Sequence, residues 1–482
     1  MPTIVRGAMV ATSHPLATRA GVQALERGGN AADAALAAAA MLTVAEPGHN
    51  GPGGDAFALL WMNGGLYGLN GSGRSPAELP RDARVQQFGP RSVTVPGVVG
   101  AWTDLAARFG RLGLDEALAP AIDAAEHGLT ATARVARQWA LVQAQRGTPW
   151  PAPKAGEIYR LPELARTLRR IAEHGAAGLY EGPVAEAIAA ASWLSVDDLA
   201  AYRSEWVEPL RLAYHGVEVC ELPPNGQGAA ALIALALDEE LAEPRLHRRI
   251  EAMKLALADA YRYVADEPLP GFLLDPAHLA ERRSLIQPDR ALDPEPSIPP
   301  RGGTTYLCCV DEDRNAVSLI QSTYEHFGSG VVAGDTGVVL QNRGAGFVDD
   351  PSHPNALAPA KRPFHTIIPG MLLEGGDLLG PFGVMGGAMQ AQGHFQLVGR
   401  MVDEGLDPQA ALDAARFRVE AGRRVLLEPG LWPEADALRA LGHEPVLAES
   451  PNEFGVGQAI VVSGEALVGG SDGRGDGHAA GY

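Results

Sequence analysis

The serine in GGSDG, residues 469–473, has the spacing of a nucleophile turn, in which a strand-to-helix corner exposes a serine hydroxyl. That arrangement needs a helix after the serine, followed by an acid and a histidine. Only nine residues follow the motif. We therefore expect no serine nucleophile there.

The other glycine loops and the histidines suggest no nucleotide or metal chemistry. GPGGD (51–55) and FGSGVVAG (327–334) lack the GxGxxG spacing, and no GxxxxGK[ST] loop occurs. The histidines are scattered, and HExxH is absent. We expect neither a cofactor nor a metal.

The three cysteines are Cys220, Cys308 and Cys309. Neighbouring residues of a strand point to opposite faces, so Cys308 and Cys309 cannot share one partner. No disulfide framework or zinc-ligand spacing can be drawn from them. We expect buried, reduced thiols.

Two glycines stand directly before two threonines in PPRGGTTYLCCVD, residues 299–311, where an apolar run begins. Glycine and proline are common in loops, and threonine favours strands. By itself this pattern predicts a loop that enters a strand.

Helical and strand patterns alternate on both sides of a proline-rich segment. Residues 15–45 form an alanine-rich helical pattern that a glycine pair interrupts. Residues 267–303 carry many prolines and predict an exposed, extended linker. Residues 304–311 and 316–324 predict two strands that a DEDRN turn joins into a hairpin.

Composition excludes several classes of partner. The chain has 482 residues, a net charge of −19 and a pI near 5.1, so it repels phosphate backbones and anionic lipid. We expect no nucleic acid and no membrane partner. The N-terminus lacks a basic start followed by an apolar stretch, and the longest apolar run (34–45) is too short to cross a bilayer. These features predict a cytoplasmic protein.

The chain resembles the γ-glutamyltranspeptidase family of N-terminal-nucleophile hydrolases nearly from end to end. The matching stretches, in order, are MVATSHPLATRAGVQALERGGNAADAALAAAAMLTVAEP, VPGVVGAW, DLAAYRSEWVEPL, ELPPNGQG, AMKLALADAYRYVAD, RGGTTYLCCVDEDRNAVSLIQSTYEHFGSGVVAGDTGVVLQNRGAGF, KRPFHTIIP, GVMGGAMQ and GGSDGRGDGHAAGY.

The resemblance implies an α+β fold, the four-layer αββα sandwich of the superfamily. It also implies a precursor that cleaves itself between Gly303 and Thr304. The products would be a large chain of residues 1–303 and a small chain of residues 304–482, which stay together as a heterodimer within one structural domain. The freed α-amine of Thr304, with an ordinary pKa of roughly 7.7–8.0, would then serve as the base for its own hydroxyl.

Further site roles follow from the resemblance. Gly386 and Gly387 correspond to the backbone oxyanion hole, against the alternative of a simple turn. Thr305 and Ser322 correspond to hydroxyls that support the nucleophile, against the alternative of strand hydroxyls bonded to the backbone.

The substrate pocket departs from the family pattern. Tyr324, Arg343 and Gly346 stand where typical members hold the ammonium of a γ-glutamyl group with Asn, a Gln-like residue and Asp. Two like charges about 4 Å apart cost roughly 4 kcal/mol at an effective dielectric of 20, so Arg343 disfavours an ammonium. Arginine is instead the preferred partner of a carboxylate.

The remaining pocket positions are also substituted. His365 and Thr366 replace a Ser-Ser pair that contacts the substrate carboxylate. Arg74 is a candidate for the family's carboxylate-binding arginine, although its local spacing differs by two residues and an exposed loop arginine is the alternative. The segment 348–360 is shorter than the lid of transpeptidating members, which favours hydrolysis over transfer.

Three functions remain open. The first is hydrolysis of γ-glutamyl amides such as glutathione through an acyl ester on Thr304. The second is hydrolysis of amides of small dicarboxylic acids, such as oxamate or glutaryl amides. The third is a binding protein that has lost self-processing, although Gly303, Thr304 and Ser322 are all retained.

Overall fold

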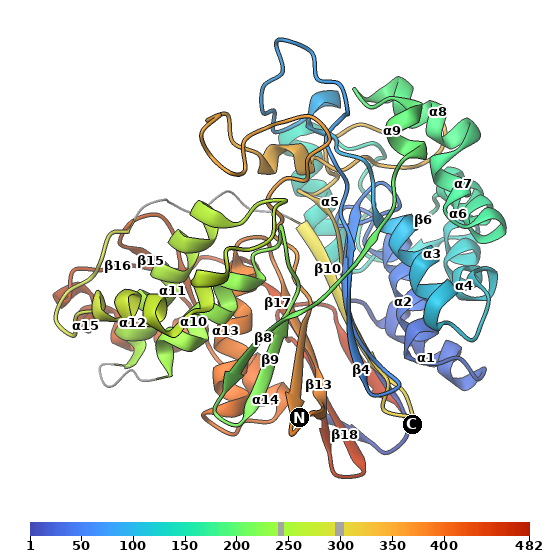
Figure 1. The fold of residues 1–482 in the computed structure, drawn as a ribbon. Helices are drawn as coiled ribbons and strands as arrows, with labels where there is room; N and C mark the ends of the chain where they lie inside the picture. The colour runs from blue at the N-terminus through green and yellow to red at the C-terminus, as the bar shows by residue number, and fades with distance from the viewer. Residues whose placement is uncertain (240–244, 295–302) are drawn as a thin grey trace.

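The computed structural model describes residues 1–239, 245–294 and 303–482. Within these residues two seven-stranded sheets lie face to face, and helices cover the outer face of each (Figure 1). This is the expected α+β arrangement of four layers.

The first sheet combines strands from both ends and the middle of the chain. Its order is β1 (Thr3–Val5), β18 (Ala466–Ser471), β17 (Val456–Ser463), β13 (Asp377–Met385), β12 (Gly370–Glu374), β9 (Val217–Glu221) and β8 (Leu210–Tyr214). Its strand pairs are antiparallel.

The second sheet carries the threonine pair. Its order is β19 (His478–Gly481), β2 (Met9–Thr12), β10 (Gly303–Val310), β11 (Ala316–Tyr324), β3 (Asp55–Met62), β4 (Gly65–Gly71) and β7 (Glu205–Val207). Strands β10 and β11 form the predicted hairpin and lie between β2 and β3. The segment after Gly303 is therefore central in its sheet.

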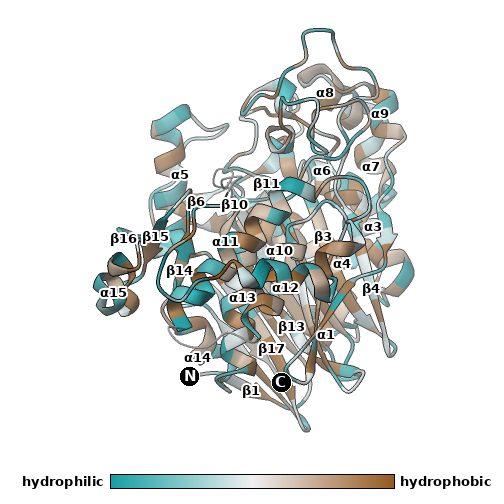
Figure 2. Cartoon of the chain, turned by 60° about the vertical axis from the view of Figure 1, so that its left-hand side comes forward, coloured by the Kyte–Doolittle hydropathy of each residue, from teal (hydrophilic) through white to brown (hydrophobic). Residues whose placement is uncertain are grey.

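Alternation along these strands builds the core between the sheets. In β10, Tyr306, Cys308 and Val310 face the other sheet, whereas Leu307 and Cys309 face the helices. The cysteines are buried and free, as predicted. Apolar residues continue through the strands in the interior of the molecule (Figure 2).

One helical layer packs on the second sheet. It contains α1 (Pro15–Glu26), α2 (Ala31–Ala45), α3 (Val98–Phe109), α4 (Leu114–His127), α6 (Pro162–His174), α7 (Ala177–Tyr180), α8 (Gly182–Ala191) and α9 (Val196–Ala200). Helix α5 (Ala133–Arg146) and the short strands β5 (Leu129–Thr130) and β6 (Ile158–Tyr159) accompany this layer.

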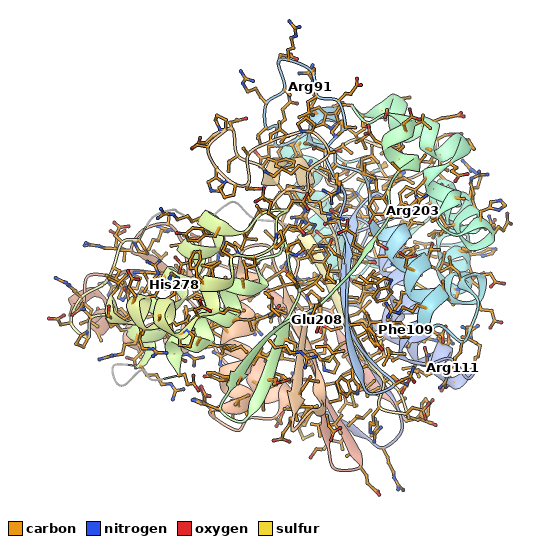
Figure 3. The ribbon with its side chains drawn as sticks, in the orientation of Figure 1. Arg91, Phe109, Arg111, Arg203, Glu208 and His278 are labelled. Atoms are coloured by element: carbon orange, nitrogen blue, oxygen red, sulfur yellow. The ribbon has the colours of Figure 1, made fainter. Side chains whose placement is uncertain are left out.

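The opposite layer packs on the first sheet. It contains α10 (Gly228–Asp238), α11 (Arg245–Tyr263), α12 (Pro276–Ser284), α13 (Met389–Val402), α14 (Pro408–Asp413) and α15 (Ala435–Ala440), with the small sheet of β14 (Phe417–Val419), β15 (Arg424–Leu427) and β16 (Glu444–Leu447). Figure 3 places His278 of α12 and Arg111, which follows α3, on opposite sides of the sheets.

The proline-rich segment is more structured than its sequence indicates. A 3-10 turn (Gly271–Leu274) and α12 lie within the predicted extended linker. Helix α12 begins at Pro276, which suits a first turn because proline lacks an N–H there. Residues 295–302 of the predicted linker lie outside the described residues.

No helix in the described part of the chain combines the length and apolar character that crossing a lipid bilayer requires.

Candidate active site

The β10–β11 hairpin sets the position of Thr304. Gly303 pairs with Tyr324 and Thr305 pairs with Gln321, and the register shifts between these two pairs. Such a bulge turns a side chain away from the regular ladder. Thr304 lies at this shift and is buried.

Two hydroxyls converge on the carbonyl oxygen of Gly303. Thr304 Oγ1 donates to it at 2.7 Å, and Ser322 Oγ donates to it at 2.6 Å. The two hydroxyl oxygens are 3.3 Å apart. The Thr304 hydroxyl thus lies beside a carbonyl that a second donor polarises, which suits attack on the Gly303–Thr304 peptide bond.

Thr305 does not share this contact. Its hydroxyl donates to the backbone oxygen of Gln321 at 3.3 Å, across the hairpin. The geometry therefore matches the alternative of a strand hydroxyl bonded to the backbone.

Gly386 and Gly387 lie between β13 and α13 in conformations that suit glycine. Their φ angles are 137° and 61°. A β-carbon on Gly386 would lie 2.9 Å from the Cα of Gly455. Neither N–H donates a hydrogen bond to another described residue, so both remain available to an oxyanion.

Gln390, near the start of α13, links the turn between β13 and α13 to the nucleophile. Its Oε1 accepts from Ile368 N at 3.1 Å, which directs Nε2 towards Thr304 Oγ1 at 3.4 Å. Sequence reasoning missed Gln390, because its partners lie far from it along the chain.

Arg343 is fully buried and only partly satisfied. Its Nη1 donates to Thr366 Oγ1 at 3.1 Å, and its guanidinium lies 4.0 Å from the ring centre of Tyr324. Its Nε and Nη2 have no hydrogen-bond partner among the described residues. Burial lowers the pKa of Arg343 to about 10, so it stays charged at neutral pH.

Tyr324 is strained where it meets Arg343. Its φ is 74°, a region that bulky residues rarely adopt. Its N–H donates to Ser322 Oγ at 2.8 Å, so one residue supports both the arginine and the hydroxyl beside Thr304. Strain of this kind concentrates at functional sites.

Asp55 is a buried carboxylate near this site that the sequence did not single out. Its Oδ1 accepts from the N–H of Gly73 and Gly97 and from Gln341 Nε2, and its Oδ2 accepts from His365 Nε2 at 3.1 Å. Burial raises the pKa of Asp55 to about 7, against the opposing charge of Arg343. The available signal was a carboxylate at the start of an apolar strand.

His365 is oriented by its neighbours and is neutral. Its Nδ1 accepts from Ile367 N at 3.2 Å, so the proton on Nε2 faces Asp55. Burial and Arg343 lower its pKa well below the usual range. Thr366 is held by Gln227, whose Nε2 also bonds the backbone oxygen of Gly387 at 2.8 Å.

The Arg74 side chain is held by two carboxylates. Its Nη1 pairs with Asp266, and its Nη2 lies 3.3 Å from Glu205 Oε1. Because two carboxylates already hold the guanidinium, these contacts match the loop alternative. Gly346 has no room for a side chain, since a β-carbon would lie 2.6 Å from the Phe364 backbone oxygen.

A separate buried cluster contains potential metal ligands. His247, Glu251 and His443 bring their ligand atoms within 4.8 Å of one another. The ammonium of Lys254 already lies among them, 2.9 Å from Glu251 Oε1 and 3.3 Å from His443 Nδ1. Lysine supplies the cation, so the cluster is a satisfied polar network.

Residues 17–482 match the gamma-glutamyltranspeptidase family. The chain is 35% identical to the glutathione hydrolase-like YwrD proenzyme of Bacillus subtilis and 34% identical to the oxamate amidohydrolase proenzyme of Klebsiella pneumoniae, with 98% of each chain covered in both comparisons. The crystal structure of a cephalosporin acylase from Bacillus halodurans superposes with a TM-score of 0.95 at 43% identity, over 100% of this chain and 97% of the other.

Proposed function

The chain belongs to the gamma-glutamyltranspeptidase family, and from this membership we propose that it is a self-processing amidohydrolase for amides of small dicarboxylic acids. The acyl group forms an ester on Thr304 and is released to water. The free carboxylate at the far end of that acyl group binds Arg343.

This proposal is carried by two guanidinium nitrogens of Arg343, Nε and Nη2, which lack a hydrogen-bond partner among the described residues. A buried arginine leaves donors unpaired at a considerable cost, unless a ligand completes its hydrogen bonds. Nε and Nη2 form the fork that binds a carboxylate through two parallel bonds. The ring of Tyr324 and the hydroxyl of Thr366 fix the plane of the guanidinium.

A chain of contacts joins Arg343 to the nucleophile. It stacks on Tyr324, whose N–H bonds Ser322 Oγ, and Ser322 contacts Thr304. We propose that the acyl group spans from the ester on Thr304 to the fork of Arg343, and the three substrates below test which acid has the right length.

Self-processing is supported by the contacts around Gly303. In the uncut chain, Thr304 lacks a free α-amine, and its hydroxyl lies against the carbonyl of the bond to be cut. Cleavage would release the amine, which then acts as the general base for later turnovers. The relatives' names describe them as proenzymes, which agrees with this order of events.

Glutathione hydrolysis is the second candidate, because a glutathione hydrolase-like protein is among the relatives. An ammonium would need a carboxylate with free lone pairs. Asp55 already accepts from four N–H groups, so it offers little to a ligand.

Three substrates distinguish the candidates. We expect wild-type protein to release amine from a glutaryl anilide faster than from the γ-glutamyl anilide, with oxamate testing the shortest acid. Replacement Arg343→Met should lower kcat/KM for the glutaryl anilide by about 10- to 150-fold, since a hydrogen-bonded charge is lost. Arg343→Lys keeps the charge without the fork and should retain only part of the wild-type kcat/KM for the glutaryl anilide.

Arg111→Met provides the control, because Arg111 is exposed and pairs with Asp313. Turnover of the γ-glutamyl anilide alone would refute the role of Arg343. Intact mass of the wild type beside Thr304→Ala tests processing separately: two chains that meet between Gly303 and Thr304 are expected in the first protein, and one chain in the second.

A further inference from the structure

A small cavity lies where α5 meets the segments that follow α2 and β11. It is lined by Glu46, Gly48, His49, Val135, Gln138, Trp139, His326 and Phe327. About 10 Å³ is open to the centre of a water-sized sphere, which is room for one water molecule.

The two imidazoles in the lining lie near Gly303 and Thr304. A β-carbon on Gly303 would lie 3.2 Å from His326 Nδ1. The rings of His49 and His326 meet edge to face with their centres 4.5 Å apart. The backbone of Thr304 lies close enough to His49 to influence its pKa.

The cavity has polar groups suited to a single water. His49 is only 6% exposed, and its Nδ1 has no hydrogen-bond partner among the described residues. Glu46 Oε1 lies 4.0 Å from that nitrogen. This separation is too long for a direct hydrogen bond and is suited to two groups that share one water.

The second oxygen of Glu46 is fixed. Glu46 Oε2 accepts from Ser13 Oγ at 2.5 Å. Ser13 therefore holds the carboxylate in place while Oε1 faces His49.

The protonation states agree with a proton acceptor in this position. Burial raises the pKa of Glu46 to about 7. Burial lowers the pKa of His326 to about 4 and that of His49 well below its usual range. Near neutral pH both imidazoles are neutral, whereas Glu46 can exchange a proton.

We infer that this cavity holds the water that completes self-cleavage, with Glu46 as its proton acceptor and His49 as the group that orients it. The inference rests on the proposed self-processing at Thr304. It concerns the second half of that reaction, after the Gly303 acyl group has moved from nitrogen to the Thr304 oxygen.

The water oxygen attacks the Gly303 carbonyl carbon, and one water proton passes to Glu46. The bond from that carbon to Thr304 Oγ1 breaks, and the proton on Glu46 passes to the departing oxygen. The large chain ends in a Gly303 carboxyl group, and the small chain begins with a free threonine.

The test follows self-cleavage of freshly folded precursor, by intact mass, in wild type, Glu46→Gln and Thr304→Ala. Glu46→Gln keeps the shape but removes the acceptor, so cleavage should slow by about 100-fold or more, the usual effect of losing a general base. The ester should still form. Added hydroxylamine should therefore release a large chain whose Gly303 carries a hydroxamate.

Two further variants control for structure. Glu251→Gln makes the same change in another buried Glu–His pair, formed by Glu251 of α11 and His443, and should cleave at the wild-type rate. Ser13→Ala removes only the support of Glu46 and should give an intermediate rate. Thr304→Ala should resist hydroxylamine.

Three outcomes would contradict these expectations. Cleavage of Glu46→Gln at the wild-type rate would assign the proton to the new α-amine and overturn the inference. A folded Glu46→Gln precursor that hydroxylamine cannot cut would place the block before the ester, which would overturn it as well. Failure of the wild type to cleave would instead refute the proposed function itself.

Discussion

At the residue scale, the shortest side-chain contacts around Thr304 meet at one atom, the carbonyl oxygen of Gly303. Ser322 supplies one of them at 2.6 Å. We expect Ser322→Ala to slow self-cleavage by about 10²–10³-fold, as for the loss of an oxyanion donor. Ser322→Thr keeps the hydroxyl and should recover most of the rate, measured by the loss of full-length chain with time.

A Thr305→Val variant separates this effect from a general loss of hydroxyls. Within the described residues the Thr305 hydroxyl bonds the backbone of Gln321 alone, so its replacement should change the rate little. Equal slowing in both variants would contradict the assignment to Ser322.

Asp55 gives the site a dependence on pH. Its pKa is about 7, so it is mostly neutral below that pH and ionised above it. Ionisation places a negative charge near Arg343 and weakens its attraction for a substrate carboxylate. We expect KM for a glutaryl anilide to rise from about pH 6 to about pH 8, by roughly tenfold per pH unit at most, the limit for one linked proton.

Asp55→Asn should remove that rise while preserving most hydrogen bonds to Gly73, Gly97 and Gln341. The measurement is KM against pH in both proteins. A KM that is flat in the wild type, or equally steep in the variant, would exclude Asp55 as the titrating group.

The sequence was informative for residues that are close in the chain and weak for those that are not. The hairpin pattern already places Ser322 opposite the start of β10. Asp55 and Gln390 reach Thr304 and Arg343 only through the packing of separate strands and helices. Tertiary structure likewise sets the two partners of Arg74, which are Glu205 and Asp266.

At the element scale, α2 depends on its first turn. All of its residues are buried, so it has no polar face that water could stabilise. Asn30 accepts from the N–H groups of Ala32 and Asp33, and its side chain donates to Phe109 O at 2.7 Å. The cap therefore satisfies helix donors and also ties α2 to α3.

We expect Asn30→Ala to lower the free energy of unfolding by about 1–2 kcal/mol, the upper part of the range for a lost cap. Denaturant unfolding of the Thr304→Ala single chain would measure it without interference from cleavage. Ser195→Ala removes the exposed cap of the short helix α9 and should cost less. A larger loss in Ser195→Ala would contradict this role of Asn30.

Some helix and turn boundaries can be predicted from the local sequence alone. The glycine pair after α1 and the DEDRN turn were visible in the sequence, because glycine and short polar turns act through local backbone geometry. Helix α12 was missed because the surrounding prolines predict an extended chain. Its Leu279 is buried in the core, and this tertiary contact outweighs local composition.

At the scale of the whole molecule, the two expected products are interleaved. Strands β10 and β11 of the small chain lie between β2 and β3 of the large chain, and the other sheet also mixes the two. We expect processed protein to elute as one native species that contains both chains, and to separate only on a denaturing gel. Elution of either chain alone would show that the shared sheets do not hold them.

This interleaving means that the continuous chain and the cleaved protein should refold differently. While the chain is continuous, each strand finds its neighbours within a single molecule. Once the Gly303–Thr304 bond is cut, the two unfolded chains must first associate. Association costs about 4–15 kcal/mol of free energy through lost translational and rotational freedom. Refolding of the processed protein should therefore depend on the concentration of the two chains, whereas refolding of the continuous Thr304→Ala chain should not.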